Sequence, residues 1–176
     1  VVGEGVAVSV RGLPGAEWRV AAHGSVRGRS FRRGTRDFAF EPGELEAKIT
    51  PKTRLLILNS PQNPTGGILS GADLDAIAEI IGRHPQIWIF ADEIYSRLVY
   101  DGCFASLASC AGMQERTIIC DGASKTWAMT GWRLGYIANR APAPTITRWI
   151  THTESCGCQT CQWRVRQGVQ RPADIV

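Results

Sequence analysis

The sequence predicts an α/β fold whose sheet is at least partly parallel. Two apolar runs, at residues 53–59 and 87–91, are bounded by proline or polar residues and predict buried strands. Between them, residues 70–84 show the apolar spacing of a helix with one buried face. Strand, helix and strand in this order form a βαβ unit, and such a connection normally joins parallel strands.

The remaining elements follow from similar patterns. Residues 41–49 predict a short helix, because proline and acidic side chains stand at its start. Ser70 and Asp73 have the spacing of a capping box at the start of the next helix, and Pro85 marks its end. Two further strands are predicted by apolar runs at residues 117–120 and 134–138.

The two ends of the chain differ in composition from its middle. Residues 1–36 contain seven arginines, seven glycines and no lysine, and they show little hydrophobic periodicity. Residues 156–176 are equally hard to interpret. We therefore expect a folded core at residues 37–155, flanked by two poorly matching segments whose composition is typical of a gene translated out of frame. The absence of an initial methionine further indicates a fragment.

Composition and charge argue against several classes of function. The net charge of +4 comes from the two ends, and we expect no nucleic-acid binding from it. No apolar run is long enough to span a membrane and no signal peptide is visible, so we expect a cytoplasmic protein. Of the six cysteines, Cys158 and Cys161 have C-x-x-C spacing without a second pair. That ligand set is incomplete, and no metal site is expected.

Polar residues follow three of the predicted strands at their carboxyl ends. Asn63 lies in a proline- and glycine-rich loop after the first strand, Asp92 directly follows the second, and Lys125 follows the third. Ligands of parallel α/β sheets gather at this edge. The sequence therefore predicts a binding site that contains these residues.

These residue types suit pyridoxal 5'-phosphate (PLP), an aldehyde cofactor. Lys125 can hold it as a Schiff base, and Asp92 can keep its pyridine nitrogen protonated. Asn63 and Tyr95 can donate hydrogen bonds to the phenolate oxygen, and Arg133 offers a planar fork to the phosphate. Each residue alone also fits an ordinary cap, turn or surface position. The prediction therefore depends on their combination at strand ends.

Three motifs resemble those of the class I and II aminotransferases, which are fold-type I PLP-dependent enzymes. They are N-S-P-Q-N-P-T-G-G at residues 59–67, A-D-E-I-Y at residues 91–95 and S-K-T-W-A-M-T-G-W-R-L-G-Y at residues 124–136. The resemblance covers about two-thirds of the chain, residues 38–155. It implies a three-layer α/β/α large domain with a mostly parallel sheet, incomplete here. It also implies that Lys125 is catalytic and that Asn63, Asp92, Tyr95 and Arg133 bind the cofactor.

The chain departs from the family pattern in two respects. Many relatives have a phosphate-binding serine three residues before the lysine, where this chain has Gly122. Ser124, adjacent to the lysine, is a weaker candidate for that role. In addition, nothing in the chain matches the family's small domain, which carries the arginine for the substrate carboxylate. The resemblance thus implies a fragment of the large domain.

The activity implied by the resemblance is transfer of an amino group between an amino acid and a 2-oxo acid. Intact family members are homodimers. Two alternatives stay open. A PLP-dependent carbon–sulfur lyase or related eliminating enzyme would use the same residues. A decayed, non-catalytic fragment would lack the parts that orient a substrate, and catalysis by orientation would suffer.

Overall fold

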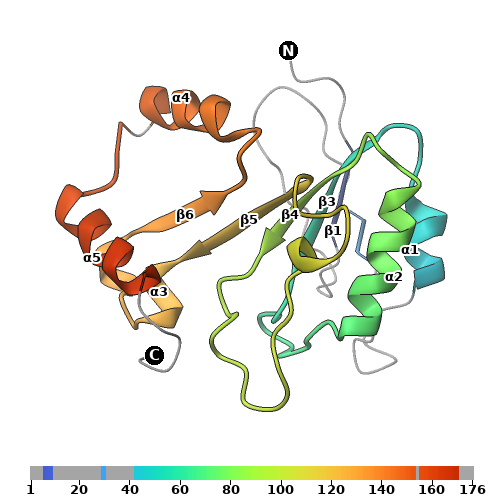
Figure 1. Ribbon diagram of the computed structural model, residues 1–176, viewed down its shortest axis with the longest axis horizontal. Coiled ribbons are helices and arrows are strands. Elements are labelled where there is room, and N and C mark those ends of the chain that lie inside the picture. The colour runs from blue at the N-terminus through green and yellow to red at the C-terminus, as the bar shows by residue number, and fades with distance from the viewer. Residues whose placement is uncertain (1–5, 10–28, 31–41, 154, 171–176) are drawn as a thin grey trace.

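The computed structural model describes residues 6–9, 29–30, 42–153 and 155–170, which build one β-sheet and the helices around it (Figure 1). The strands are β1 (Val6–Ser9), β2 (Arg29–Ser30), β3 (Thr53–Asn59), β4 (Trp88–Asp92), β5 (Thr117–Gly122) and β6 (Gly135–Ala138). The helices are α1 (Pro42–Lys48), α2 (Gly71–Gly82), α3 (Ala123–Thr126), α4 (Ala143–Thr153) and α5 (Gln159–Val169). Two 3₁₀ helices, η1 (Leu107–Ser109) and η2 (Thr130–Trp132), complete this part of the chain.

The sheet has the strand order β2-β1-β3-β4-β5-β6. All neighbouring pairs are parallel except β5 and β6, which are antiparallel. The predicted α/β fold with a mostly parallel sheet is therefore confirmed. Strand β6 reverses direction because the connection from β5 holds only α3 and η2. A connection without a crossover helix brings the chain back beside the strand it has just left.

Strands β1 and β2 lie within residues 1–36, where the sequence predicted no regular structure. Both are parallel to their neighbours, and β1 pairs with β3. Elements of two to four residues contain too few side chains to show a hydrophobic period. Their place in the sheet therefore depends on strand pairing, of β1 with β3 and of β2 with β1, rather than on a local pattern.

Helix α2 begins at the predicted capping box. Asp73 N donates to Ser70 Oγ at 3.2 Å, and Ser70 N donates to Asp73 Oδ2 at 2.9 Å. Two backbone donors that a helix start would otherwise leave unpaired are satisfied in this way. The helix ends at Gly82, three residues before Pro85, as the sequence predicted.

The core lies between one face of the central strands and the pair α1 and α2. Leu56 and Leu58 of β3 are 1% and 3% exposed, whereas their neighbours Leu55 and Ile57 are only half-buried. This alternation arises because successive side chains of a strand point to opposite faces. Buried side chains of both helices join the strands in one cluster, among them Leu45, Leu74, Ile77 and Ile81. Each such side chain stabilises the fold by roughly 1.5–3 kcal/mol.

The helices at the other end of the sheet gather near β5 and β6 (Figure 1). Gly168 of α5 packs against Trp127, since a Cβ added there would lie 2.9 Å from Trp127 Cζ2. Cys161 and Val165 of the same helix are buried. Helix α5 therefore packs on the loop that carries Lys125. Across the residues placed by the structure, no helix has both the length and the apolar character needed to cross a membrane.

Candidate active site

Three parallel strands end side by side at one edge of the sheet. Asn59 of β3 is the register partner of Asp92 in β4, and Asp92 is the partner of Cys120 in β5. Each strand then passes into a loop with predicted site residues. The register therefore brings together loops that are about thirty residues apart in the sequence.

Asn59 ties the loop of Asn63 to the end of β4. Its Nδ2 donates to Asp92 O at 3.4 Å, and its Oδ1 accepts from Asn63 N at 3.4 Å. Ser60 N also donates to Asp92 O, at 3.3 Å. The Asn63 side chain is exposed at this edge. Asn59 belongs to one of the three motifs, but no pattern in the sequence pointed to this linking contact.

The turn after β4 carries Asp92 and Tyr95. Asp92 Oδ1 accepts from Ile94 N at 3.4 Å, and Glu93 N donates to Cys120 O at 2.9 Å. The bond from Glu93 extends the contact between β4 and β5 past the end of β4, whereas the bond from Ile94 lies within the turn. Tyr95 is then half-buried and directed toward the loop after β5, as its contact with Lys125 requires.

Lys125 lies in α3, directly after β5. Its Nζ is 5.5 Å from the centroid of the Tyr95 ring, within the range of a cation–π interaction. The lysine side chain is exposed, so a small molecule can reach the amine. The structure thus brings together two predicted site residues that come from different strands.

Ser124 and Arg133 are linked through Thr130. Thr130 Oγ1 donates to Ser124 O at 3.1 Å, and Arg133 Nη1 donates to Thr130 O at 3.1 Å. Arg133 has φ 52° and ψ 43°, a left-handed conformation that is unfavourable for a residue with a Cβ. Such conformations persist where the surroundings impose them, and they are common at functional sites. Sequence analysis did not single out Thr130.

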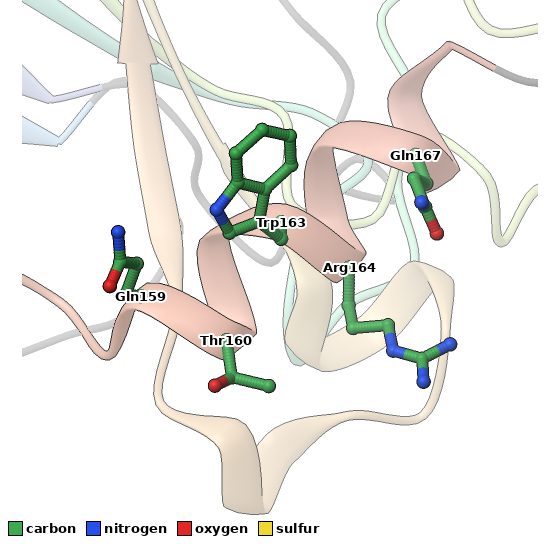
Figure 2. Close-up of a pocket in the computed structure, with 5 residues that line it drawn as sticks. All are labelled: Gln159, Thr160, Trp163, Arg164 and Gln167. Carbon is green, nitrogen blue, oxygen red and sulfur yellow. The ribbon is translucent and has the colours of Figure 1, made fainter.

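Arg133 also lines a cavity of about 720 Å³ beside α5. Its other lining residues are Gly131, Trp132, Ile150, Cys156, Gly157, Cys158 and Cys161. A second pocket, of about 600 Å³, lies on α5 itself and is lined by Gln159, Thr160, Trp163, Arg164 and Gln167 (Figure 2). Neither is lined by Lys125, Asp92 or Asn63. Cavity volume alone therefore does not locate the predicted site.

The three cysteines that line the cavity beside Arg133 are Cys156, Cys158 and Cys161, and all are free thiols. Within the described ranges, no three His, Cys, Asp or Glu side chains are grouped so that they could hold a metal ion.

Gly122 stands where the family pattern has serine, and it packs tightly against β6. A Cβ there would lie 3.0 Å from both Gly135 Cα and Leu134 O, which are backbone atoms. We predict that Gly122→Ser destabilises the fold by about 1–3 kcal/mol, because overpacking forces the backbone to shift. Urea unfolding measures the loss. Gly131→Ser is the control, since a Cβ there meets nothing within 4 Å, and equal losses in both variants would contradict the prediction.

Glu93 is a buried carboxyl group, 8% exposed, that sequence analysis did not select. Ser106 Oγ donates to Glu93 Oε1 at 2.6 Å. Burial raises the pKa of Glu93 above its ordinary value of 4.5; the bond from Ser106 opposes this, and Asp121 and Asp92 add to it. The folded state therefore binds this proton more tightly than the unfolded state. The resulting stability is present below about pH 4.5 and is lost as the pH rises through the raised pKa.

We expect Glu93→Gln to unfold at a higher temperature than the parent chain near pH 7 and at a similar temperature near pH 4. Glutamine keeps an acceptor for Ser106 but cannot ionise, so it carries no cost of a buried charge. Thermal unfolding followed by circular dichroism at both pH values gives the comparison. Glu115→Gln, at an exposed position, is the control. A lower midpoint for Glu93→Gln near pH 7 would refute this explanation.

Comparison with known proteins agrees with this geometry. The family model for aminotransferase class I and II matches residues 22–163. The chain belongs to this family. An aspartate/prephenate aminotransferase of Cereibacter sphaeroides is 39% identical over 144 residues, which are 79% of this chain and 36% of that protein. An aromatic-amino-acid aminotransferase of Thermococcus litoralis is 52% identical over 115 residues, 65% of this chain and 29% of that protein.

Solved structures show the same relationship for this aminotransferase-family chain. The aspartate aminotransferase of Rhizobium meliloti superposes with a TM-score of 0.86 at 29% identity, covering 99% of this chain and 45% of that one. An aromatic aminotransferase of Pyrococcus horikoshii gives 0.82 at 31% identity, covering 96% and 46%. The chain therefore spans less than half of these structures, and about a third of the two curated relatives above.

Proposed function

We propose that this chain is the cofactor-binding part of a PLP-dependent aminotransferase. The observation that carries the proposal is the placement of the Lys125 amine over the Tyr95 ring, at the sheet edge where β4 ends in Asp92. The groups present fit PLP. They offer an accessible amine for its aldehyde, a carboxylate for its ring nitrogen and a guanidinium for its phosphate. The names of the relatives support aminotransfer over elimination as the reaction.

Each residue would have a distinct task in that site. Lys125 Nζ would hold the cofactor and, once the amino group of the substrate had displaced it, the freed amine would take the proton from the substrate Cα. Asp92 would keep a proton on the pyridine nitrogen, and Tyr95 and Asn63 would donate hydrogen bonds to the phenolate oxygen. Arg133 would bind the phosphate, with Ser124 as a weaker contributor. When bound, PLP supplies an electron sink for the charge that develops at the substrate Cα.

The proposal also covers the extent of the PLP-binding core, the substrates and the assembly of the intact enzyme. Residues 37–155 would form the PLP-binding core, flanked by the two segments of different composition. The substrates would be an amino acid and a 2-oxo acid, with aspartate as the first donor to test, given the names of the relatives. A cytoplasmic homodimer is expected of the intact enzyme.

A PLP titration followed by incubation with aspartate tests the proposal. We expect saturable binding of PLP, and conversion of aspartate to its 2-oxo acid while the amino group stays on the cofactor. Aspartate has no sulfur leaving group at Cβ, so cysteine is incubated in parallel. Release of sulfide and ammonia from cysteine, without conversion of aspartate, would favour the eliminating enzyme. Saturable binding without any conversion would favour a non-catalytic fragment. A chain that fails to bind PLP would overturn the proposal.

A further inference from the structure

Asp121 and Tyr136 face each other across the antiparallel pair of β5 and β6. Tyr136 Oη donates to Asp121 Oδ2 at 3.1 Å, and Gly122 N donates to Asp121 Oδ1 at 2.6 Å. The two residues are register partners, so their side chains lie on the same face of the sheet. Both carboxylate oxygens are therefore engaged, one with each strand.

The loop between these strands begins and ends at this pair. Lys125 comes four residues after Asp121, and Arg133 comes three residues before Tyr136. At the adjoining position, Ala123 N donates to Leu134 O at 3.1 Å and continues the ladder into the loop. The pair thus closes the base of the loop that carries both the amine and the guanidinium.

The surroundings of this pair strengthen its hydrogen bond. Both side chains are half-buried, where water competes less for a polar contact. Burial raises the pKa of Tyr136 to about 12, and the Asp121 carboxylate adds to it, so the hydroxyl keeps its proton as a donor. Burial also raises the pKa of Asp121 above its ordinary value, against the hydrogen bonds from Gly122 and Tyr136. The bond joins a hydroxyl to a carboxylate, and its length of 3.1 Å exceeds that of the strongest bonds of this type.

We propose that Asp121 and Tyr136 are positioning residues, whose contact fixes the base of loop 123–134 and thereby the spacing between the Lys125 amine and the Arg133 guanidinium. This inference rests on the proposed function, because it takes those two groups as the ones that hold PLP. If the pair were purely structural, loss of its contact would lower the stability of the whole fold. Loss of a positioning contact instead changes the exchange of the loop and the affinity for PLP.

Asn139 provides a matched control at the opposite end of the same strand pair. Its Nδ2 donates to Thr117 O at 2.9 Å and to Glu115 O at 3.1 Å. Asn139→Ala therefore loosens β5 and β6 far from the loop. It tests whether any weakening of the two strands has the same effect.

Hydrogen–deuterium exchange of the cofactor-free chain measures the loop directly. We expect Tyr136→Phe to speed the exchange of residues 123–134 by about tenfold, because one hydrogen bond to a charged group is lost. Asp121→Asn should exchange at a rate between those of the parent and Tyr136→Phe. Its Oδ1 can still accept from Gly122 N and its Nδ2 can donate to Tyr136 Oη, but the charged acceptor is lost. Unchanged exchange in Tyr136→Phe, or equal acceleration in Asn139→Ala, would overturn the inference.

PLP affinity supplies the second readout. We expect Tyr136→Phe to bind PLP about tenfold more weakly than Asn139→Ala, with similar urea midpoints for the two variants. Equal affinity of Tyr136→Phe and the parent chain would overturn the positioning role. Failure of the parent itself to bind PLP would instead overturn the proposed function, and the exchange measurement alone would then decide the claim about the loop.

Discussion

Replacing Lys125 with alanine should abolish covalent attachment of PLP to this chain and weaken its apparent affinity by tenfold or more, about 1.4 kcal/mol. The chain has three lysines, and Lys125 is the one at the edge where β3, β4 and β5 end. Its amine is the group that can react with the aldehyde. The measurement is the amount of PLP that stays with the protein after gel filtration.

Two further variants separate chemistry from charge and from folding. Lys125→Arg keeps a cation near the Tyr95 ring but cannot form the linkage, so it should lose attachment as completely as alanine does. Lys52→Ala, at an exposed position outside the site, should retain it. All three should unfold within about 0.5 kcal/mol of the parent, since both lysine side chains are exposed. Full retention of PLP by Lys125→Arg would contradict the account.

The largest expected effect on stability comes from Ile89→Ala in β4. Ile89 is fully buried, at 0% exposure, on the strand that ends at Asp92. Removing its branched side chain should cost about 2–5 kcal/mol, from both the lost burial and the cavity left behind. Domains of this size have only about 5–15 kcal/mol of stability. Urea unfolding should therefore show a large fall in midpoint, with loss of PLP binding at intermediate urea.

Graded controls test the cause of that loss. Ile89→Val removes one methylene group and should cost about 0.5–1.5 kcal/mol. Tyr100→Ala removes a larger side chain that is 92% exposed, and the change should stay within about 0.5 kcal/mol. If Ile89→Ala were as mild as Tyr100→Ala, burial in this core would not be what holds β4 in place.

The central βαβ unit could be predicted from the sequence because its signals are local. The bounds of β3 matched the apolar run, and α2 began at the capping box formed by Ser70 and Asp73. The family of the protein could also be predicted, because three motifs occur in order along the chain. These features depend on short-range spacing, which a single sequence contains.

Other features depend on contacts that short-range patterns do not encode. The reversal of β6 follows from pairing with β5, and an apolar run predicts a strand without its direction. Helix α5 could not be predicted because few of its residues are apolar, and two of these, Trp163 and Val169, are exposed. The position of α5 depends on the packing of Gly168 against Trp127, two residues that are about forty positions apart in the sequence.

The candidate site was predictable in residue type but not in its connections. Asp92 and Lys125 could be selected because they follow predicted strands. The contacts of Asn59 and Thr130 could not, because they depend on strand register and on the fold of a loop. The pairing of Asp121 with Tyr136 would have required knowing that β6 returns antiparallel to β5. A polar residue opposite a tyrosine across such a return is the signal that could have revealed it.

Borohydride reduction of the PLP-treated chain, followed by peptide mass spectrometry, tests the central claim most directly. The chain offers three lysines, Lys48, Lys52 and Lys125, so the two outside the site act as internal controls. We predict that the cofactor is found on Lys125 at near one equivalent, with only trace labelling of the other two. Equal labelling of all three lysines, or labelling of Lys48 or Lys52 in preference to Lys125, would contradict the account.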